Sequence, residues 1–271
     1  MHIEPITPHI GAEISGIDLG DAAQVADFAE PLRQALARHQ VIFFRDQALT
    51  PDSQVRFSEV FGAIERVSST FPSHPDNPHV ELLISKGKRT GTDIWHADLT
   101  WQPAPPAAAC LYAVDVPATG GDTMWASMTT AFDSLQPEMQ QYLRRLQAIH
   151  DWEAPALADN LKQQDATGQR YQQMRATYPP IEQPVVLKHP VTGLPLVFVN
   201  SLYTRYIRGL GHDESTSLIQ LLSGLAKVPE WQVRFRWRLG SVAVWDNLAT
   251  QHYAINDYHP SARRMHRVAI R

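Results

Sequence analysis

The chain has 271 residues, of which 44% are hydrophobic and 19% are charged. This composition is typical of a globular protein, and it excludes a wholly disordered, collagen-like or coiled-coil chain. The formal net charge of −4 excludes a general attraction to nucleic acid, and no apolar stretch is long enough to span a membrane.

Hydrophobic periodicity predicts helices in four ranges: 21–40, 51–61, 128–147 and 213–226. In the first range, Pro31 is expected to shift or break the helix, because proline cannot donate a backbone hydrogen bond. Thr50 followed by a proline is typical of a capped helix start. Asp213 is expected to cap the last helix.

Most of the remaining pattern indicates strands. Val41–Phe44 predicts a short buried strand, and apolar residues alternate with arginines in 232–239, the period of a half-buried strand. A hairpin is expected around Val191–Gly193, and further strands are expected at 241–246 and 263–270. Strands at turn-punctuated intervals with helices outside them favour a sandwich or barrel over a doubly wound parallel sheet.

No repeat or linker divides the sequence, so we expect one domain covering 1–271. The polar, glutamine-rich segment 151–183 is too long for a simple connection and is interpreted as a lid. Cys110 is the only cysteine and cannot form an internal disulfide, which favours a cytoplasmic location. A homo-oligomer is one alternative for the quaternary state.

His96 and Asp98 are the first candidates for a metal site. Residues two apart on a strand point to the same face, so both side chains can bind one ion. This pair alone is a weak signal, and a structural hydrogen-bonded pair is the commoner outcome. A third ligand could come from His252, which follows a predicted strand. Two histidines and one carboxylate would leave three coordination positions open, as non-haem Fe(II) oxygenases need.

Arg263 and Arg267 are candidates for binding an anion. They lie four residues apart on the final predicted strand and therefore share a face, and two arginines on an inward face need anions nearby. An edge strand with solvated arginines is the equal alternative. Thr123, after the glycine pair Gly120–Gly121, either follows a tight turn or offers its hydroxyl to a carboxylate.

Together, these motifs resemble the taurine dioxygenase family of Fe(II)- and 2-oxoglutarate-dependent dioxygenases. Several motifs in matching order and spacing are more specific than any one of them. The resemblance extends over nearly the whole chain and rests on six segments: Gly11–Leu19, His39–Gln47, Trp95–Asp98, Gly120–Thr123, Trp245–Tyr253 and Arg263–Arg267.

The resemblance implies a mainly β fold with flanking helices, the double-stranded β-helix or jelly-roll. It implies one role for each of the following residues. The iron ligands would be His96, Asp98 and His252. Thr123 and Arg263 would bind the distal carboxylate of 2-oxoglutarate, and Arg267, in the same anion cavity, would meet the sulfonate or sulfate group of the substrate. The substrate pocket would be lined by Tyr203, Leu99 and Trp101.

The implied reaction is oxidative and needs O2. 2-Oxoglutarate is converted to succinate and CO2, the carbon bearing the sulfur group is hydroxylated, and the product collapses to an aldehyde plus sulfite or sulfate. Two departures argue against taurine itself as the substrate. Taurine-specific members have asparagine where this chain has Thr92, and histidine and tyrosine in the loop that is 63–70 here. Another alkylsulfonate or an alkyl sulfate ester is expected.

Three alternatives remain at this stage. The first is a 2-oxoglutarate dioxygenase for another small carboxylic acid, such as an aryloxyalkanoate or an amino acid, because Arg267 would bind a carboxylate equally well. The second is a non-catalytic jelly-roll protein that binds a ligand. The third is a zinc hydrolase with the same three ligands, which would not need Thr123 and Arg263.

Overall fold

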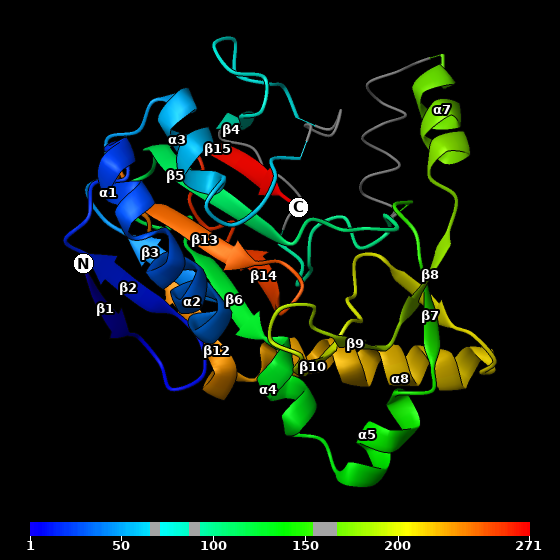
Figure 1. Ribbon diagram of the computed structural model, residues 1–271. Helices are drawn as coiled ribbons and strands as arrows, with labels where there is room; N and C mark the ends of the chain where they lie inside the picture. Colours follow the sequence, from blue (N-terminus) through cyan, green and yellow to red (C-terminus); the bar gives the residue numbers. More distant parts are fainter. Residues whose placement is uncertain (66–70, 87–92, 154–166) are drawn as a thin grey trace.

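The computed structural model describes residues 1–65, 71–86, 93–153 and 167–271. Within these ranges, the largest sheet has seven strands (Figure 1). Its strand order is β1 (His2–Pro5), β2 (Ala12–Ser15), β3 (Val41–Phe44), β13 (Val242–Asp246), β5 (Ala108–Asp115), β15 (Ala262–Ile270) and β4 (Glu81–Lys86). All neighbouring strands are antiparallel except β2 and β3, which are parallel.

A second sheet faces the first. It contains β12 (Gln232–Phe235), β6 (Thr123–Ser127) and β14 (Thr250–Ala254), in that order. Aromatic and aliphatic side chains from both sheets fill the space between them, including Phe43, Trp125, Phe235, Trp245 and Met265. Two mainly antiparallel sheets around one apolar interior form the jelly-roll that the sequence predicts.

The predicted alternation in 232–239 holds for most of its length. Val233, Phe235 and Trp237 are buried between the sheets. Leu239 is 69% exposed, contrary to the prediction, because β12 ends at Phe235 and the chain turns away before that residue. The alternating pattern therefore outlasts the strand itself.

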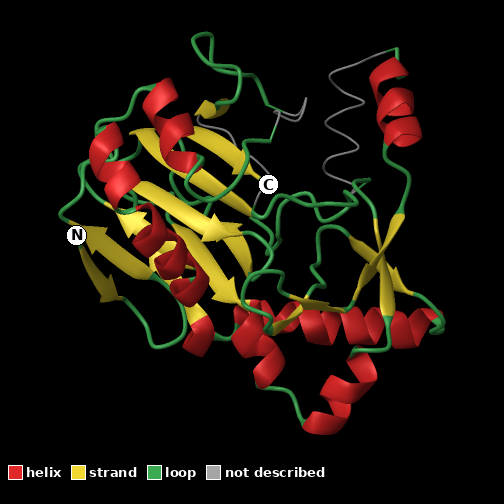
Figure 2. Ribbon diagram, viewed as in Figure 1, coloured by secondary structure: helices red, strands yellow, loops and turns green. Residues whose placement is uncertain are grey.

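Three helices cover the outer face of the large sheet (Figures 1 and 2). They are α1 (Ala22–Asp27), α2 (Ala29–His39) and α3 (Pro51–Ser58). The helix predicted over 21–40 breaks at Phe28, which places Pro31 in the first turn of α2, where the missing N–H costs little. Thr50 caps α3 by accepting a hydrogen bond from the Ser53 amide, as predicted.

The remaining helices and strands of the described ranges form a second lobe beside the two sheets (Figure 1). One small sheet has the order β11 (Thr204–Ile207), β7 (Gln147–His150), β8 (Ile181–Pro184), and the predicted hairpin is β9 (Val186–Lys188) with β10 (Pro195–Val197). The helical elements of this lobe are α4 (Met128–Asp133), α5 (Pro137–Leu143), α7 (Gln169–Thr177), α8 (His212–Gly224) and the 3-10 turns η1 (Leu225–Lys227) and η2 (Pro229–Trp231).

Two helix predictions in this lobe need correction. The single helix expected over 128–147 is two helices, because Pro137 starts a new one and the chain enters β7 at Gln147. Asp213 does not cap α8. Gly211 occupies that position, and Glu214 reaches back to accept a hydrogen bond from the Gly211 amide at 2.8 Å.

Residues 154–166 of the predicted lid segment 151–183 lie outside the described ranges. Its described part contains α7, none of whose residues is buried. The lid remains a prediction. No helix in the described ranges is long and apolar enough to cross a membrane.

Candidate metal centre and anion site

Two histidines face each other across a short extension of the smaller sheet. His252 lies in β14, and the backbone of His96 pairs with it through hydrogen bonds of 3.1 and 2.7 Å. Residues directly opposite on antiparallel strands project their side chains to the same face. The two imidazole centroids are accordingly 4.2 Å apart.

Asp98 completes a cluster with these histidines. Its Oδ1 lies 3.5 Å from Nε2 of His96 and 3.8 Å from Nε2 of His252. One potential ligand atom from each residue falls within 4.8 Å of the others. The structure therefore brings together the three residues that the sequence singled out as metal ligands.

Both histidines present Nε2 to the cluster. Nδ1 of His96 lies 2.7 Å from the carbonyl oxygen of Ile94, which is satisfied when Nδ1 carries the proton and leaves the Nε2 lone pair toward the cluster. Burial, together with repulsion from His96, lowers the pKa of His252 to about 3. A neutral imidazole is the form that binds a metal ion.

Arg267 connects this cluster to a second carboxylate. Its Nη1 donates to Oδ2 of Asp98 at 3.1 Å, and its Nε and Nη2 both lie 2.6 Å from Oε2 of Glu81. Burial alone would raise the pKa of Asp98, but Arg267 and the two histidines outweigh it and hold that pKa well below its usual range. Because Arg267 takes Oδ2, only Oδ1 of Asp98 faces both histidines.

The guanidinium group of Arg263 lies close to Trp237, which is buried between the sheets. Two of its three nitrogens have no bonded counter-ion in the described part of the chain. The residue as a whole is partly exposed, but its Nε and Nη2 atoms are buried and have no hydrogen-bond partner among the described residues. Its guanidinium carbon lies 5.7 Å from the centre of the Trp237 ring. A buried donor group without a partner is costly, so these atoms are suited to an anionic ligand.

Thr123 meets the same tryptophan. Nε1 of Trp237 donates to the Thr123 hydroxyl oxygen at 2.9 Å, which leaves the hydroxyl hydrogen available to a ligand. Gly120 and Gly121, just before it, have φ angles of +78° and +70°, which favour glycine. The glycine pair therefore forms the tight turn and places Thr123 at the start of β6, whereas binding of a carboxylate by the Thr123 hydroxyl stays a prediction.

Comparison with known proteins identifies the group to which this architecture belongs. The family model described as "Taurine catabolism dioxygenase TauD, TfdA family" matches residues 2–269. The chain belongs to the TauD/TfdA family. This assignment makes it an enzyme of the dioxygenase class, an oxidoreductase, and confirms the resemblance inferred from the sequence.

Individual relatives agree with the assignment. A sulfate ester dioxygenase of Pseudomonas putida, named as dependent on alpha-ketoglutarate, is 35% identical over 100% of this chain and 89% of its own length. An alkylsulfatase of Acinetobacter baylyi is 32% identical over 100% of this chain and 84% of its own. The crystal structure of a taurine dioxygenase from Burkholderia xenovorans superposes with a TM-score of 0.80 at 32% identity, covering 99% of this chain and 88% of that one.

An apolar wall adjoins the cluster, as this family membership leads one to expect. Tyr203 and Trp101 are buried in one hydrophobic cluster, against which Leu99 packs. The Tyr203 ring lies 6.4 Å from that of His96, and burial, helped by the Asp98 charge, raises the pKa of its hydroxyl. The three residues predicted to line a substrate pocket therefore lie together beside the candidate metal ligands.

Two residues that position this site were not identified from the sequence. Asn247 bonds to both the backbone amide and the carbonyl of Asp98, and its side chain is completely buried. Such a clamp suits the chain here, because Leu99 has a φ angle of +54°, unfavourable for a non-glycine residue. Glu81 is the other one. A lone carboxylate within the apolar run Val80–Ile84 was the signal that could have indicated it.

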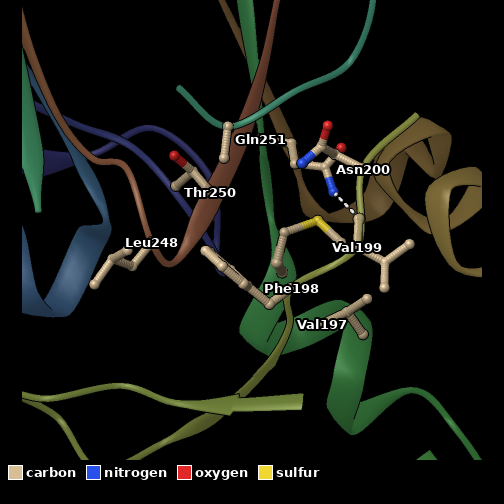
Figure 3. A pocket seen from close by; sticks show the side chains of 9 residues that line it. Val197, Phe198, Val199, Asn200, Leu248, Thr250 and Gln251 are labelled. Carbon is tan, nitrogen blue, oxygen red and sulfur yellow. Dashed lines mark hydrogen bonds between the residues drawn. The ribbon is translucent and has the colours of Figure 1, made fainter. Parts of the chain in front are cut away.

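Figure 3 shows a small pocket lined by residues that are neighbours of the candidate ligands in the sequence. Ala97 and Gln251, each adjacent in sequence to a ligand, line it together with Val197–Asn200 and others. Gln251 donates from Nε2 to the carbonyl oxygen of Val199 at 2.7 Å. Because neighbouring side chains on a strand point to opposite faces, Gln251 lies on the face of β14 opposite to that of His252.

The sequence features that argue against taurine are only partly described. Thr92 and residues 66–70 of the 63–70 loop lie outside the described ranges. His74, which is out of register with the taurine pattern, packs its ring 5.0 Å from that of His266, on the strand that carries Arg267.

Proposed function

We propose that this enzyme is an Fe(II)- and 2-oxoglutarate-dependent dioxygenase that hydroxylates the carbon bearing a sulfate or sulfonate group. The observation that supports the proposal is the bond between Arg267 and Asp98, since it holds a guanidinium group beside the candidate metal ligands. Two relatives with over 30% identity along the whole chain are named for sulfate ester chemistry. Neither favours the non-catalytic alternative.

The donor set fits Fe(II). His96, Asp98 and His252 supply two imidazole nitrogens and one carboxylate oxygen, the combination that leaves three positions open on an octahedral ion. Bound Fe(II) with 2-oxoglutarate activates O2 for hydroxylation of a C–H bond and leaves succinate and CO2 as by-products. Arg267 donates a hydrogen bond to Oδ2 of Asp98, which leaves Oδ1 as the oxygen that would bind the metal ion.

The proposed place for the distal carboxylate of 2-oxoglutarate is beside Arg263 and Thr123. Nε and Nη2 of Arg263 can donate two parallel hydrogen bonds to a carboxylate, and the Thr123 hydroxyl can donate a third. Binding would satisfy donors that are otherwise buried without partners. This need for an anion is what supports the assignment.

Arg267 would orient the primary substrate by its sulfur oxyanion. Of the five N–H groups of its guanidinium, three are engaged with Glu81 and Asp98, so two can donate to the substrate. Tyr203, Leu99 and Trp101 would hold the alkyl part and exclude water. Hydroxylation of the carbon next to the sulfur group gives a product that collapses to an aldehyde with loss of sulfate from an ester or sulfite from a sulfonate.

We further propose that the reaction takes place in the cytoplasm. Its participants are small molecules, the organic anion and O2, and the single cysteine, Cys110, is buried and unpaired, as suits a reducing compartment. A homo-oligomer remains one of the alternatives from the sequence.

A substrate panel tests the proposed chemistry. The purified enzyme with Fe(II), 2-oxoglutarate and O2 is incubated with alkyl sulfates, alkylsulfonates, taurine and aryloxy acids, and succinate, sulfate and sulfite are measured. Sulfate or sulfite should form in a 1:1 ratio with succinate for at least one alkyl compound. Succinate formation coupled only to an aryloxy acid would establish the carboxylic-acid alternative instead.

A metal-binding measurement tests the ligands separately. His252→Ala should remove stoichiometric Fe(II) binding while the circular dichroism spectrum stays unchanged, because the residue lies in the last strand of the smaller sheet and its side chain points into the site. His9→Ala, which changes an exposed loop histidine, is the matched control. Normal Fe(II) affinity in the His252 variant would contradict the ligand assignment.

A further inference from the structure

Glu81 lies directly opposite Arg267 on the neighbouring strand β4. The two residues are Cα partners in the register of β15 with β4, and Oε2 of Glu81 lies 2.6 Å from both Nε and Nη2 of Arg267. Glu81 is only 2% exposed. The arginine assigned to the substrate anion is thus already paired with a buried carboxylate before any substrate arrives.

This pairing changes the charge that a substrate meets. Arg267 stands between Glu81 and Asp98, one positive charge against two negative charges. In the proposed loaded site, the two charges of Fe(II) cancel those of 2-oxoglutarate, and Arg263 offsets Asp98. Arg267 and Glu81 then offset each other, so the pocket is formally neutral when the substrate enters.

A neutral buried pocket discriminates between anions by their charge. The cost of leaving net charge in a poorly solvated site grows with the square of that charge, so a doubly charged anion is penalised far more than a singly charged one. The two N–H groups that remain on Arg267 can still bind a sulfur oxyanion through hydrogen bonds. Sulfate esters and sulfonates carry one negative charge near neutral pH, whereas phosphate monoesters carry close to two.

We propose that Glu81, acting through Arg267, sets the charge selectivity of the substrate site in favour of singly charged oxyanions. The proposal rests on the proposed function and deepens it, because it names a residue that separates sulfate esters from phosphate esters of the same shape. Glu81 contacts neither substrate nor metal in this arrangement. Glu81 changes the electrostatic potential at the substrate anion, whereas Arg267 makes the direct contact with that anion.

The test compares two ligands that differ chiefly in charge, hexyl sulfate and hexyl phosphate. Their dissociation constants are measured by calorimetry without O2, on enzyme loaded with Fe(II) and 2-oxoglutarate, so that the readout is binding. Glu81→Gln keeps the shape and removes the charge, whereas Glu81→Asp keeps the charge and alters the shape. Glu13→Gln serves as the control. Glu13 lies on the distant strand β2 and forms an ion pair with Arg45, so this variant removes the same charge far from the site.

Wild type should bind hexyl sulfate more tightly than hexyl phosphate. In Glu81→Gln this preference should shrink by roughly tenfold or more, because one unit charge close to a partly desolvated site acts more strongly on a dianion than on a monoanion. Glu81→Asp and Glu13→Gln should keep the wild-type ratio, whatever happens to the absolute affinities. An unchanged ratio in Glu81→Gln would overturn the proposal.

A measurement on the wild-type enzyme covers the case in which Glu81→Gln does not fold. Hexyl phosphate gains a proton near pH 6, whereas hexyl sulfate stays a monoanion. Between pH 7.5 and 5.5, hexyl phosphate should therefore gain affinity relative to hexyl sulfate, and no relative gain would overturn the claim. If wild type bound no hexyl sulfate at all, the proposed substrate class would be wrong, which is a distinguishable result.

Discussion

The backbone amide of Asp98 donates a hydrogen bond of 2.7 Å to Oδ1 of Asn247, and the side-chain amide of Asn247 donates back to the Asp98 carbonyl at 2.9 Å. A further bond of 2.9 Å joins Asn247 to the carbonyl of Pro106. One fully buried amide thus fixes the backbone on which the candidate metal carboxylate stands. Side chains that orient a ligand in this way commonly affect metal affinity nearly as much as the ligands do.

Asn247→Ala should therefore weaken Fe(II) binding by roughly 10–100-fold. It should also lower the free energy of unfolding by about 2–4 kcal/mol, because buried backbone groups of Asp98 and Pro106 lose their partners. Metal titration and urea denaturation measure the two effects. Asn77→Ala removes a surface bond to Asp52 and should change neither quantity appreciably. An Asn247 variant with wild-type metal affinity would show that the clamp does not position Asp98.

Arg263 gives a prediction in which stability and binding change in opposite directions. Arg263→Met replaces two buried nitrogens that have no partner among the described residues with an apolar chain of similar length, so without 2-oxoglutarate the free energy of unfolding should rise by about 1–3 kcal/mol. Binding of 2-oxoglutarate should weaken by about 2–5 kcal/mol. Denaturation and equilibrium binding on the same samples check both, and a destabilised variant that still binds 2-oxoglutarate normally would contradict the assignment.

Arg267→Ala should have the opposite effect on stability. Its removal leaves Asp98 and Glu81 buried with a lost partner, so the free energy of unfolding should fall by about 3–5 kcal/mol, measured by urea denaturation of the metal-free protein. The affinity for an alkyl sulfate should fall as well, with a smaller effect on 2-oxoglutarate. The Arg267 and Arg263 variants thus form a matched pair, one charge removed in each. Equal stability changes in the two would refute the distinction between an arginine bonded to two carboxylates and one whose Nε and Nη2 have no partner in the described part of the chain.

Because of His150, the free energy of unfolding should depend on pH in a way that does not involve the metal ligands. It is completely buried and bonded through its two ring nitrogens to Thr100 and Thr204, and burial, with a smaller effect of Arg205, lowers its pKa to about 3. The unfolded chain protonates this histidine first as the pH falls. Its contribution is therefore complete above about pH 6.5 and is lost progressively toward pH 3.

Replacing His150 with asparagine should reduce the slope of unfolding free energy against pH by about 1.4 kcal/mol per pH unit between these limits. Urea denaturation of the metal-free protein at a series of pH values gives the slope. His9→Asn, at an exposed position, should leave it unchanged. The slope is the decisive quantity, since the substitution also alters the hydrogen bonds of His150 and with them the stability at every pH.

Local patterns were sufficient for the parts of the fold and site that depend on local rules. His96 and Asp98 do lie together as predicted, but only His96 pairs with a strand and the chain turns from Asp98 onward, so strand alternation is not the reason. Alternation did place Arg263 and Arg267 on one face of β15, with buried Met265 between them. Motif order and spacing, through the family resemblance, added His252. The alternation argument succeeds for the arginines because the direction of a side chain on a strand depends mainly on its position along that strand.

The parts that could not be predicted depend on which strands become neighbours. Glu81 meets Arg267 from 186 positions away, and Asn247 meets Asp98 from 149 positions away. No local pattern encodes such contacts, because they depend on which distant segments the tertiary fold brings together. The split of the helix expected over 128–147 was a different matter, since Pro137 was visible in the sequence and was overridden by the continuing hydrophobic period.

The bridge between His96 and His252 has a consequence for how the site comes into being. Its two backbone bonds join residues far apart in the chain, so they belong to the contacts of high sequence separation that form late in folding. The first two candidate ligands leave the ribosome long before the third, and a chain that has not yet paired β14 with β6 offers no complete metal site. Metal binding should therefore occur only after β14 has paired with β6. In a stopped-flow refolding experiment, metal binding should follow the recovery of fluorescence from the buried tryptophans.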